Sequence, residues 1–398
     1  MTPRHQRDLT RRKMLFALGG AAVAAPAIAA IAPYAMAGTT DAAPKAAGSL
    51  PLTIVNNSGS FGNASVYVYI VGNQDGQQVR VTQDGTLAPI SLSDNGADGF
   101  TDYALTLAGS GETQLSLPHM SGRIYVSLGA KLKFKAVKDG NGNAALQYPA
   151  GWVTSDPSFA VLHDCAEFTY NSAGMFCNTT MVDMFSVPMS IRLKGDKEQT
   201  TGTVRDGGRA AAFAAVKQVE DFAPLVVDDV RVIAPGHGLD SGLFAKDYFA
   251  PYIDEVWSTY TGKDLTVTTS AGTFTGRVRA DRFTFDGPAA VSFAKPSTRD
   301  VLFCDGGLAA PNDGTTGPVA AVLGAGFNRS TLLSNPAQPT TSAADFYRTD
   351  LTNHYSKAIH AATEDGKAYG FAFDDVADFA SFIQDTAPTA IRLTLTPF

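Results

Sequence analysis

Short runs of alternating apolar and polar residues, separated by turn signals, are the feature that most restricts how this chain can fold. The runs LPLTIVNNSG and ASVYVYIVG open the series after Ser49 and have the period of two that a half-buried strand requires. LSLPHMSGRIYVSLGAKLKFKAV predicts a long strand pair further on. Turn-forming residues divide these segments: Gly76, Asp84-Gly85, Asn95-Gly96, Gly111 and Asp139-Gly140-Asn141-Gly142. This rhythm predicts a β-sandwich or barrel domain over residues 50–195.

Two acidic residues stand out near the end of this β region. Glu167 lies in EFTYN, where polar and aromatic residues alternate, so that its carboxylate lies on the polar face of a strand. After a turn at Gly174, NTTMVDMFSVPMSIRL predicts a second, adjacent strand that carries Asp183. No Lys or Arg stands close by in the sequence, so we expect no salt bridge at either acid. Two unpaired carboxyls among hydroxyls and amides suit glycoside hydrolysis, although two solvated surface acids are the plain alternative.

The composition changes after Lys194, where helical and extended segments begin to alternate. GRAAAFAAVKQVEDF, SGLFAKDYFAPYIDEVWSTY, GPVAAVLGAGFNRSTL and AADFYRTDLTNHYSKAIHAATED predict helices. We expect Pro251 to bend or restart the second of them. VDDVRVIAPG and residues 265–303 predict strands, and IRLTLTPF predicts a last strand that returns to the first sheet. The fold expected is mainly β with a mixed α/β domain, residues 196–387, inserted before residues 388–398 rejoin the β domain.

Residues 1–37 have the features of an export signal. Arg11 and Arg12 precede an Ala-rich apolar segment that ends in Ala35-Met36-Ala37, a small-residue cleavage site. The alternative, a membrane anchor, is opposed by Pro26 and Pro33 and by the glycines within this segment. We therefore expect a secreted protein exported by the twin-arginine route, with a linker at 38–49 and no stable membrane anchor.

The negative net charge of the chain argues against an anionic partner such as nucleic acid. The formal net charge is −7, and loss of residues 1–37, which hold five basic residues and one acid, would leave −11. A negative chain is a poor binder of nucleic acid, whereas a neutral polysaccharide is compatible with it. We expect a monomer that needs no cofactor.

The cysteines and histidines indicate no metal site. The three cysteines are Cys165, Cys177 and Cys304. The first two flank the turn between the predicted acid-bearing strands, so a disulfide between them is one possibility, but folding before export takes place in a reducing compartment. The histidines are scattered without the spacing of metal ligands, and we expect them, His237 included, to be packed or surface residues.

The segment AEFTYNSAGMFCNTTMVDMFSVP resembles the signature of the glycoside hydrolase family 64 β-1,3-glucanases, thaumatin-like enzymes that include a laminaripentaose-producing type. The resemblance continues through RVIAPGHG, YFAPYIDEVWSTY, AGFNRSTLL and DGKAYGFAFDDV. It implies a thaumatin-like β-barrel or sandwich plus a mixed α/β domain that together form a wide groove for β-1,3-glucan. It also implies that Glu167 and Asp183 are the catalytic pair.

Other site residues follow from the same resemblance. Their implied positions are Thr169, Asn171 and Thr180, which would hold the sugar chain, and Phe176, which stands where the family can carry a Trp platform. Phe keeps the stacking but lacks the indole donor. For the three polar residues, simple β-strand hydroxyls and amides are the alternative.

Three further residues are weaker candidates for sugar contacts. Arg231 would hydrogen-bond sugar hydroxyls, or instead pair with Asp228 or Asp229. Asp374 and Asp375 would line the far wall of the groove, although capping of a helix in VADFASFI is the alternative for one of them.

We expect a hydrolase, an endo-acting or processive β-1,3-glucanase, that cleaves laminarin or curdlan with inversion. Glu167 would be the general acid, protonated and more buried, and Asp183 the more solvated base. Inversion requires carboxyl groups about 6.5–9.5 Å apart, against about 5–5.5 Å in a retaining enzyme. The competing hypothesis is a thaumatin-like protein that binds β-glucan without cutting it. A purely structural envelope protein makes no use of the paired acids.

Overall fold

The computed structural model describes residues 48–398 and divides them into two compact units. The first holds residues 48–178, Met189–Thr200 and Ile383–Thr396, and the second holds Thr179–Pro188, Thr201–Phe382 and Pro397–Phe398. The predicted export signal and most of the predicted linker lie outside the described residues. The chain leaves the first unit and returns to it near its end, but residues 179–188, which we assigned to the first domain, belong to the second unit.

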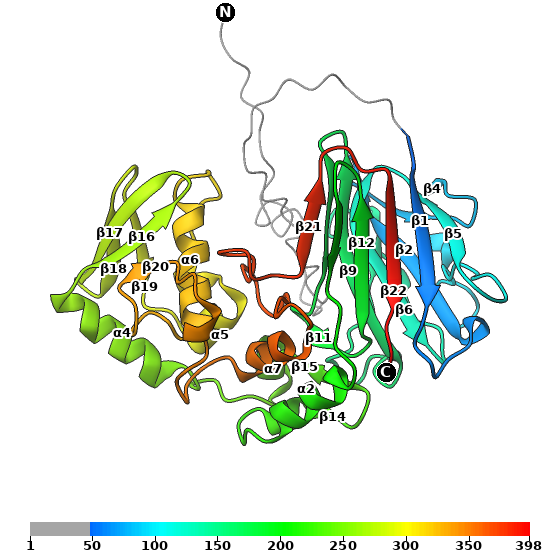
Figure 1. Cartoon of the computed structure of the whole chain (residues 1–398). Coiled ribbons are helices and arrows are strands. Elements are labelled where there is room, and N and C mark those ends of the chain that lie inside the picture. Colours follow the sequence, from blue (N-terminus) through cyan, green and yellow to red (C-terminus); the bar gives the residue numbers. More distant parts are fainter. Residues whose placement is uncertain (1–47) are drawn as a thin grey trace, which may run out of the picture. The chain divides into compact units, whose positions relative to one another are not determined.

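One sheet of the first unit joins the two ends of the described chain (Figure 1). β1 and β22 are parallel neighbours, with Leu52 opposite Ile391 and Ile54 opposite Leu393. Both strands alternate between buried apolar and more exposed residues, so their apolar faces must be buried together. The predicted return of the last strand is therefore confirmed. In order, the five strands are β13 (Glu198–Thr201), β12 (Met189–Lys194), β22 (Ala390–Leu395), β1 (Leu50–Asn56) and β5 (Thr113–Leu117).

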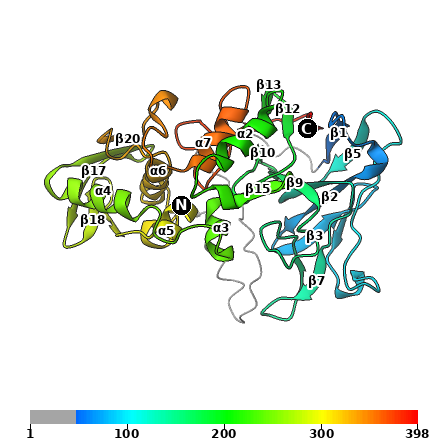
Figure 2. The same cartoon turned by 90° about the horizontal axis from the view of Figure 1, so that it is seen from below.

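The other large sheet of this unit carries the EFTYN strand. Its order is β21 (Phe382–Asp385), β10 (Gly174–Thr179), β9 (Leu162–Asn171), β6 (Met120–Leu128), β2 (Val66–Gln74), β3 (Gln77–Val81) and β4 (Leu87–Pro89). Tyr69, Tyr125 and Phe134 are buried in an aromatic cluster of this unit. Figure 2 shows β9, β2 and β3 from below. A separate hairpin, β7 (Lys135–Lys138) and β8 (Ala144–Gln147), closes around the Asp139–Gly142 turn, where the Asp139 amide donates to the Asn143 carbonyl at 2.8 Å.

The strand pair predicted over residues 115–137 was wrong as a pair. β5 joins β1 in one sheet, whereas β6 pairs with β2 and β9 in the other. Pro118 stands between them and lacks an amide donor, so the ladder cannot run through it.

The second unit combines short sheets with helices. A small sheet has the order β11 (Met184–Phe185), β15 (Arg231–Ile233) and β14 (Val226–Val227). A larger one has the order β19 (Val291–Ala294), β18 (Arg282–Asp286), β17 (Gly272–Arg279), β16 (Leu265–Thr269) and β20 (Ala337–Gln338). The helices are α2 (Gly208–Lys217), α3 (Pro235–Ser241), α4 (Ala250–Gly262), α5 (Thr298–Phe303), α6 (Gly317–Asn328) and α7 (His354–Ala362). α2 and α7 lie side by side (Figures 1 and 2).

Short 3₁₀ turns occur in both units, at Asn63–Ser65, Leu92–Asp94, Ala223–Leu225, Gly306–Leu308 and Ala343–Asp345.

Several predicted helices are shorter than expected. α4 begins at Ala250, because Pro251 fits the first turn of a helix but not its interior. Phe244, Tyr248, Tyr252, Val256 and Tyr260, which recur every four residues along this segment, are all buried and form part of the core. The strand region predicted up to Phe303 ends at Ala294 and is followed by α5, and the last long helix is reduced to α7.

The predicted mainly β fold with a mixed α/β portion is confirmed.

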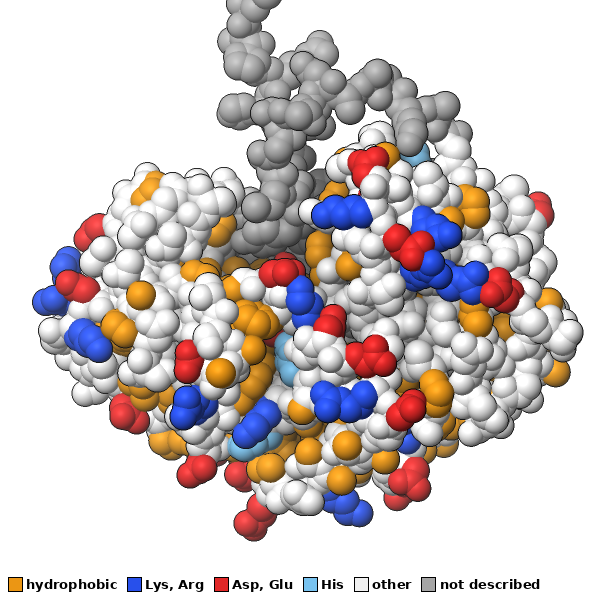
Figure 3. Space-filling view, in the orientation of Figure 1, with side chains coloured by type: hydrophobic (Ala, Val, Ile, Leu, Met, Phe, Trp, Pro, Cys, Tyr) orange, Lys and Arg blue, Asp and Glu red, His pale blue; other side chains and the backbone are white. Residues whose placement is uncertain are grey.

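On the face in Figure 3, acidic and basic side chains are interspersed and gather into no patch of one sign. Within the described part of the chain, every helix is too short or too polar to span a bilayer.

Candidate active site

The surroundings of Glu167 are set by the pairing of β9 with β6. Three antiparallel pairs follow one another on the same face: Tyr125 with Cys165, Arg123 with Glu167, and Ser121 with Thr169. Residues two apart on a strand share a face, so this face passes from an apolar pair to an ionic pair to a hydroxyl pair. Tyr125 and Cys165 belong to the buried aromatic cluster. Glu167 therefore stands where the hydrophobic core ends and the polar part of the sheet begins.

Arg123 holds one oxygen of Glu167. Its Nε and Nη2 donate to Oε1 at 3.0 and 2.9 Å, and the Glu167 residue is 3% exposed. On the neighbouring strand β10, Asn178 Nδ2 donates to Oε2 at 3.4 Å. The expectation that Glu167 has no basic partner was wrong, because strand register brings in an arginine 44 residues away in the sequence.

The predicted sugar-binding residues of β9 and β10 lie at different depths. Thr169 is buried and its hydroxyl bonds to Ser121 at 3.0 Å. Asn171 is exposed at the end of β9, and its Oδ1 accepts from the amide of Ala173 at 2.8 Å. Phe176 is half-buried and, two residues before Asn178, shares the face on which Asn178 meets Glu167. Phe176 and Thr169 are thus on the Glu167 face of the sheet.

The sequence predicted that Asp183 lies on a strand adjacent to β9, and this prediction was wrong. It directly precedes the two-residue strand β11, which pairs with β15 in the second unit. The predicted single strand is broken, with β10 ending at Thr179 and β12 beginning after Pro188. Asp183 Oδ1 lies 2.8 Å from His237 Nε2, and its carbonyl accepts from the Ala234 amide at 3.0 Å.

The two carboxylates differ in exposure in the expected order. The Glu167 side chain is 4% exposed and the Asp183 side chain is 14% exposed. Thr180, which was predicted to hold the sugar chain, is buried. Its hydroxyl has no hydrogen-bond partner among the described residues. A buried hydroxyl without a partner costs free energy, so Thr180 is available to a ligand that reaches it.

Two of the weaker candidates are too deeply buried for the role predicted. Arg231 is 0% exposed, and its Nη1 lies 3.3 Å from the sulfur of Met184. Asp374 is also 0% exposed and caps no helix, since VADFASFI forms turns and the start of β21. Neither side chain presents a surface to a sugar chain, so both predictions of sugar contact were wrong. Asp375 is half-buried, and its sugar contact stays a prediction.

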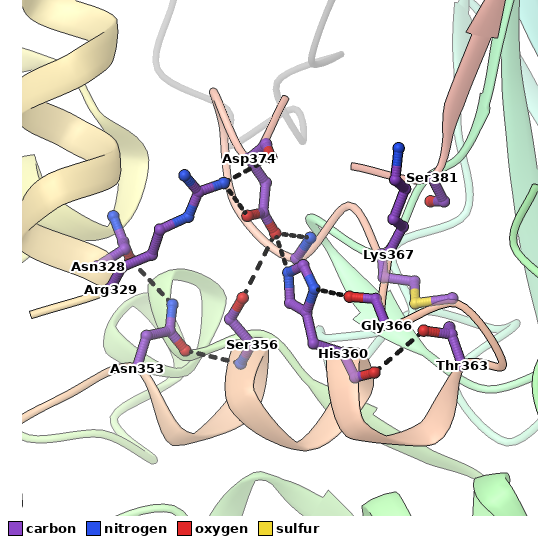
Figure 4. A network of polar contacts seen from close by, with 12 residues as sticks. Asn328, Arg329, Asn353, Ser356, His360, Thr363, Gly366, Lys367, Asp374 and Ser381 are labelled. Atoms are coloured by element: carbon purple, nitrogen blue, oxygen red, sulfur yellow. Dashed lines mark hydrogen bonds and ion pairs between the residues drawn. The ribbon is translucent and has the colours of Figure 1, made fainter. Parts of the chain in front are cut away.

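Asp374 instead joins a buried ionic network in the second unit. Figure 4 shows its carboxylate between Arg329 and His360. Arg329 Nη2 donates to Oδ1 at 3.0 Å, and His360 Nε2 and the Gly370 amide each lie 2.9 Å from Oδ2. Ser356 Oγ lies 3.4 Å from the same oxygen.

The network shifts two pKa values in opposite directions. Burial alone would raise the pKa of Asp374, but His360, Arg329 and the Gly370 amide outweigh it, and the pKa is lowered. Burial would likewise lower the pKa of His360, but the Asp374 charge and the Gly366 carbonyl outweigh it, and the pKa is raised. The pair is therefore held as an ion pair inside the fold.

The cysteines and the remaining polar residues suggest no metal chemistry. Cys165 and Cys177 are buried and are not joined by a disulfide. Burial raises the pKa of Cys177 far above its usual range. Among residues 48–398, no group of three or more His, Cys, Asp or Glu has the arrangement of a metal site.

The sequence did not reveal two residues that contact the two acids, Arg123 and His237. Both come from elements far away in the sequence. Asn178 is one of the amides expected around the acids, and it contacts Glu167.

Comparisons with known proteins agree with this geometry. The sequence profile of glycoside hydrolase family 64, described as β-1,3-glucanase, matches residues 48–395. The glucan endo-1,3-β-glucosidases of Arthrobacter sp. (strain YCWD3) and Cellulosimicrobium cellulans are each 34% identical to it, over 92% of this chain and 68% of their own length.

Solved structures show the same relationship. A laminaripentaose-producing β-1,3-glucanase in complex with laminaritetraose aligns with a TM-score of 0.80 and 36% identity, over 88% of this chain and 99% of that one. A family 64 β-1,3-glucanase domain from Clostridium beijerinckii aligns with a TM-score of 0.76 and 29% identity, over 88% and 98%. The chain therefore belongs to glycoside hydrolase family 64, the β-1,3-glucanases.

Proposed function

We propose that this protein is a secreted endo-β-1,3-glucanase that cleaves laminarin- or curdlan-type glucans to oligosaccharides with inversion. The observation that carries the proposal is the contrast between its two carboxylates. Glu167 is buried at the edge of an aromatic core, and Asp183 is more exposed and accepts a hydrogen bond through one oxygen. An acid and a base with different surroundings are what an inverting glycosidase requires.

In this mechanism Glu167 protonates the glycosidic oxygen as the bond from that oxygen to the anomeric carbon breaks. Asp183 takes a proton from a water molecule whose oxygen forms the new bond to the same carbon from the opposite face. The proton lost by Glu167 is regained from solvent in the next cycle, as Asp183 releases its own. The reaction needs only the glucan, water and these two carboxyl groups.

The contacts of Glu167 assign different tasks to its oxygens. Arg123 donates two hydrogen bonds to Oε1, so that oxygen is held as an acceptor. Oε2 has only the long contact from Asn178 at 3.4 Å among its described hydrogen bonds. We assign the transferable proton to Oε2.

The substrate is inferred from the relatives and from the local surfaces. One relative was solved with laminaritetraose, and the Glu167 face carries a half-buried ring, Phe176, with the hydroxyls of Ser121 and Thr169. An aromatic ring beside hydroxyls suits a sugar, which has apolar faces and polar edges. We propose that Phe176, Thr169, Asn171 and Thr180 hold the glucan.

Export by the twin-arginine route remains part of the proposal. It rests on Arg11, Arg12 and the cleavage motif before Gly38, all outside the described residues. N-terminal sequencing of protein from the culture medium tests it, since a mature chain beginning after Ala37 is expected.

The decisive experiment follows the anomeric configuration of newly formed reducing ends. Proton NMR during hydrolysis of laminarin should show the α-anomer first, followed by mutarotation. Glu167→Gln and Asp183→Asn should each abolish hydrolysis while the protein still folds and unfolds in a cooperative thermal transition, at a lower midpoint for Glu167→Gln because Arg123 loses its buried partner. A β-anomer as first product would contradict inversion, and wild-type binding without release of sugar would favour the non-catalytic alternative.

A further inference from the structure

His237 contacts Asp183 directly, and the mechanism above gives it no role. Its Nε2 lies 2.8 Å from Asp183 Oδ1, and the two side chains are 10% and 14% exposed. A surface ion pair contributes little because water competes with it. A contact so largely withdrawn from water fixes both groups more strongly.

The chain places His237 over Asp183 through consecutive backbone contacts. β11 pairs with β15 so that Met184 lies opposite Ile233, and the next residue on each side is joined by the hydrogen bond from the Ala234 amide to the Asp183 carbonyl. α3 begins directly afterwards, with a proline in its first turn. His237 is therefore less than one helical turn from a residue that is hydrogen-bonded to Asp183.

The glycines on either side of His237 allow this helix to pack closely. A Cβ added at Gly236 would lie 2.9 Å from the ring of Phe303, and one added at Gly238 would lie 2.3 Å from Leu225. The ring of Phe303 meets the His237 ring edge to face, with centroids 5.7 Å apart. The imidazole is thus confined by packing while its Nε2 is directed at the carboxylate.

The direction of the hydrogen bond follows from the acceptor. An ionised carboxylate can only accept, so His237 Nε2 carries the hydrogen and donates to Oδ1. Hydrogen bonds to charged groups are shorter and stronger than neutral ones. The bond fixes the plane of the Asp183 carboxylate with respect to the small sheet that carries it.

We propose that His237 is a positioning residue that orients the Asp183 carboxylate for its work as the general base. This inference rests on the proposed function of Asp183. His237 itself moves no proton between substrate and water, and it acts only through the bond to Oδ1. The rate of the chemical step therefore depends on a donor at the position of Nε2, whereas substrate affinity does not.

A matched pair of variants separates the donor from the rest of the side chain. In His237→Gln the amide nitrogen reaches the position of Nε2, whereas in His237→Asn, shorter by one methylene, it reaches only the position of Nδ1. We expect H237N to lower kcat about 10- to 100-fold, the rate equivalent of a lost hydrogen bond to a charged group. H237Q should keep kcat within about three-fold of the wild type, with KM little changed in both.

His237→Phe serves as the packing control. It keeps a ring against Phe303 without a donor, so it should resemble H237N in kcat and the wild type in thermal midpoint. Equal loss of kcat in H237Q and H237N, or full activity in H237N and H237F, would overturn the proposal. If H237F does not fold, the Gln and Asn pair decides alone.

Asp183→Asn in the same assay separates failure of this inference from failure of the proposed function. If D183N is inactive while H237N and H237F are fully active, Asp183 is needed and His237 is not. If D183N itself retains wild-type kcat, the role of Asp183 as the base is refuted, and the positioning role of His237 is refuted with it.

Discussion

Asp374→Asn should destabilise the second unit by about 3 kcal/mol, because it removes the charge that balances a buried arginine. Asp374 is 0% exposed, and the side chain of Arg329 is 2% exposed. Asn has nearly the same shape as Asp, so the substitution changes the charge and the hydrogen bonds rather than the packing.

The size of the effect follows from the contacts of the carboxylate. Oδ1 accepts from Arg329, and Oδ2 accepts from His360 and the Gly370 amide. An amide offers one acceptor oxygen, so its NH₂ group must face donors on one of the two sides. Breaking a buried ion pair costs about 3–5 kcal/mol.

The lower end of that range applies because Arg329 keeps other partners. Its Nη1 still donates to the Val376 carbonyl at 2.8 Å, and its Nη2 to the Asp374 carbonyl at 2.7 Å. The rings of Phe346 and Phe379 lie 4.6 and 5.2 Å from its guanidinium carbon. These contacts offset part of the lost charge.

The cost should depend on pH in a defined way. The lowered pKa of Asp374 contributes stability above its unfolded value of about 3.9, and this is lost as the pH falls through the folded pKa. The raised pKa of His360 contributes stability in full below its unfolded value of about 6.5, and this is lost as the pH rises through the folded pKa. The difference between wild type and D374N should therefore be largest between about pH 4 and 6.5.

Urea unfolding followed by tryptophan fluorescence can measure this cost for the second structural unit alone. The chain has two tryptophans, Trp152 in the first unit and Trp257 in the second, so a Trp152→Phe background leaves only the second unit visible. With an m value of about 3 kcal/mol/M, a loss of about 3 kcal/mol moves the midpoint down by about 1 M.

The control for this experiment is Asp378→Asn. Asp378 also pairs with a basic residue, Lys367, at 2.7 Å, but its side chain is 85% exposed, so D378N should cost less than about 1 kcal/mol. A D374N midpoint equal to that of D378N, or a pH-independent difference, would refute the argument that the buried network stabilises this unit.

Two further predictions concern Glu167 and its sheet face. Arg123→Lys should lower kcat about 10-fold, because one ammonium cannot reproduce the two N–H donors that hold Oε1. Arg123→Met should lower kcat and the thermal midpoint further, because it leaves Oε1 of the buried Glu167 without a donor; unchanged kinetics in R123M would show that this contact is not needed. Phe176→Ala should raise KM for laminarin oligosaccharides about 3- to 10-fold with kcat less affected, and Phe176→Trp should restore it; equal KM values for Phe, Ala and Trp would exclude a stacking role.

The sequence predicted the β elements of the first unit well because their alternation is local. All three expected strands β1, β2 and β9 form; β1 alternates between buried and more exposed residues as the pattern indicates, whereas β2 and β9 are buried on both faces over most of their length. The sheet to which each strand belongs was less predictable, because it depends on pairing between strands that are far apart in the sequence. The segment around Asp183 predicts one strand, whereas backbone pairing with β15 places Met184 and Phe185 in a different sheet.

The helices show a similar division between local and distant causes. Pro251 marks the start of α4 by its own stereochemistry. Nothing local shows that VADFASFI, with an apolar pattern and acidic residues ahead of it, is not a helix. Asp374, which precedes this segment, accepts a hydrogen bond from Arg329, 45 residues away in the sequence. The backbone has positive φ values at Phe373, Ala377 and Asp378, which are incompatible with a continuous helix.

The residues that hold the two carboxylates lie far from them in the sequence. Arg123 reaches Glu167 across a strand pair, and His237 reaches Asp183 from a helix that begins after the partner strand of β11. In both cases the partner is chosen by strand register, which no window around the acid contains. Each unit therefore fixes one carboxylate with a basic side chain of its own, Arg123 in the first and His237 in the second. It follows that the effects of changing Arg123 and His237 should be independent, and that kcat should fall in the double variant by the product of the two single effects.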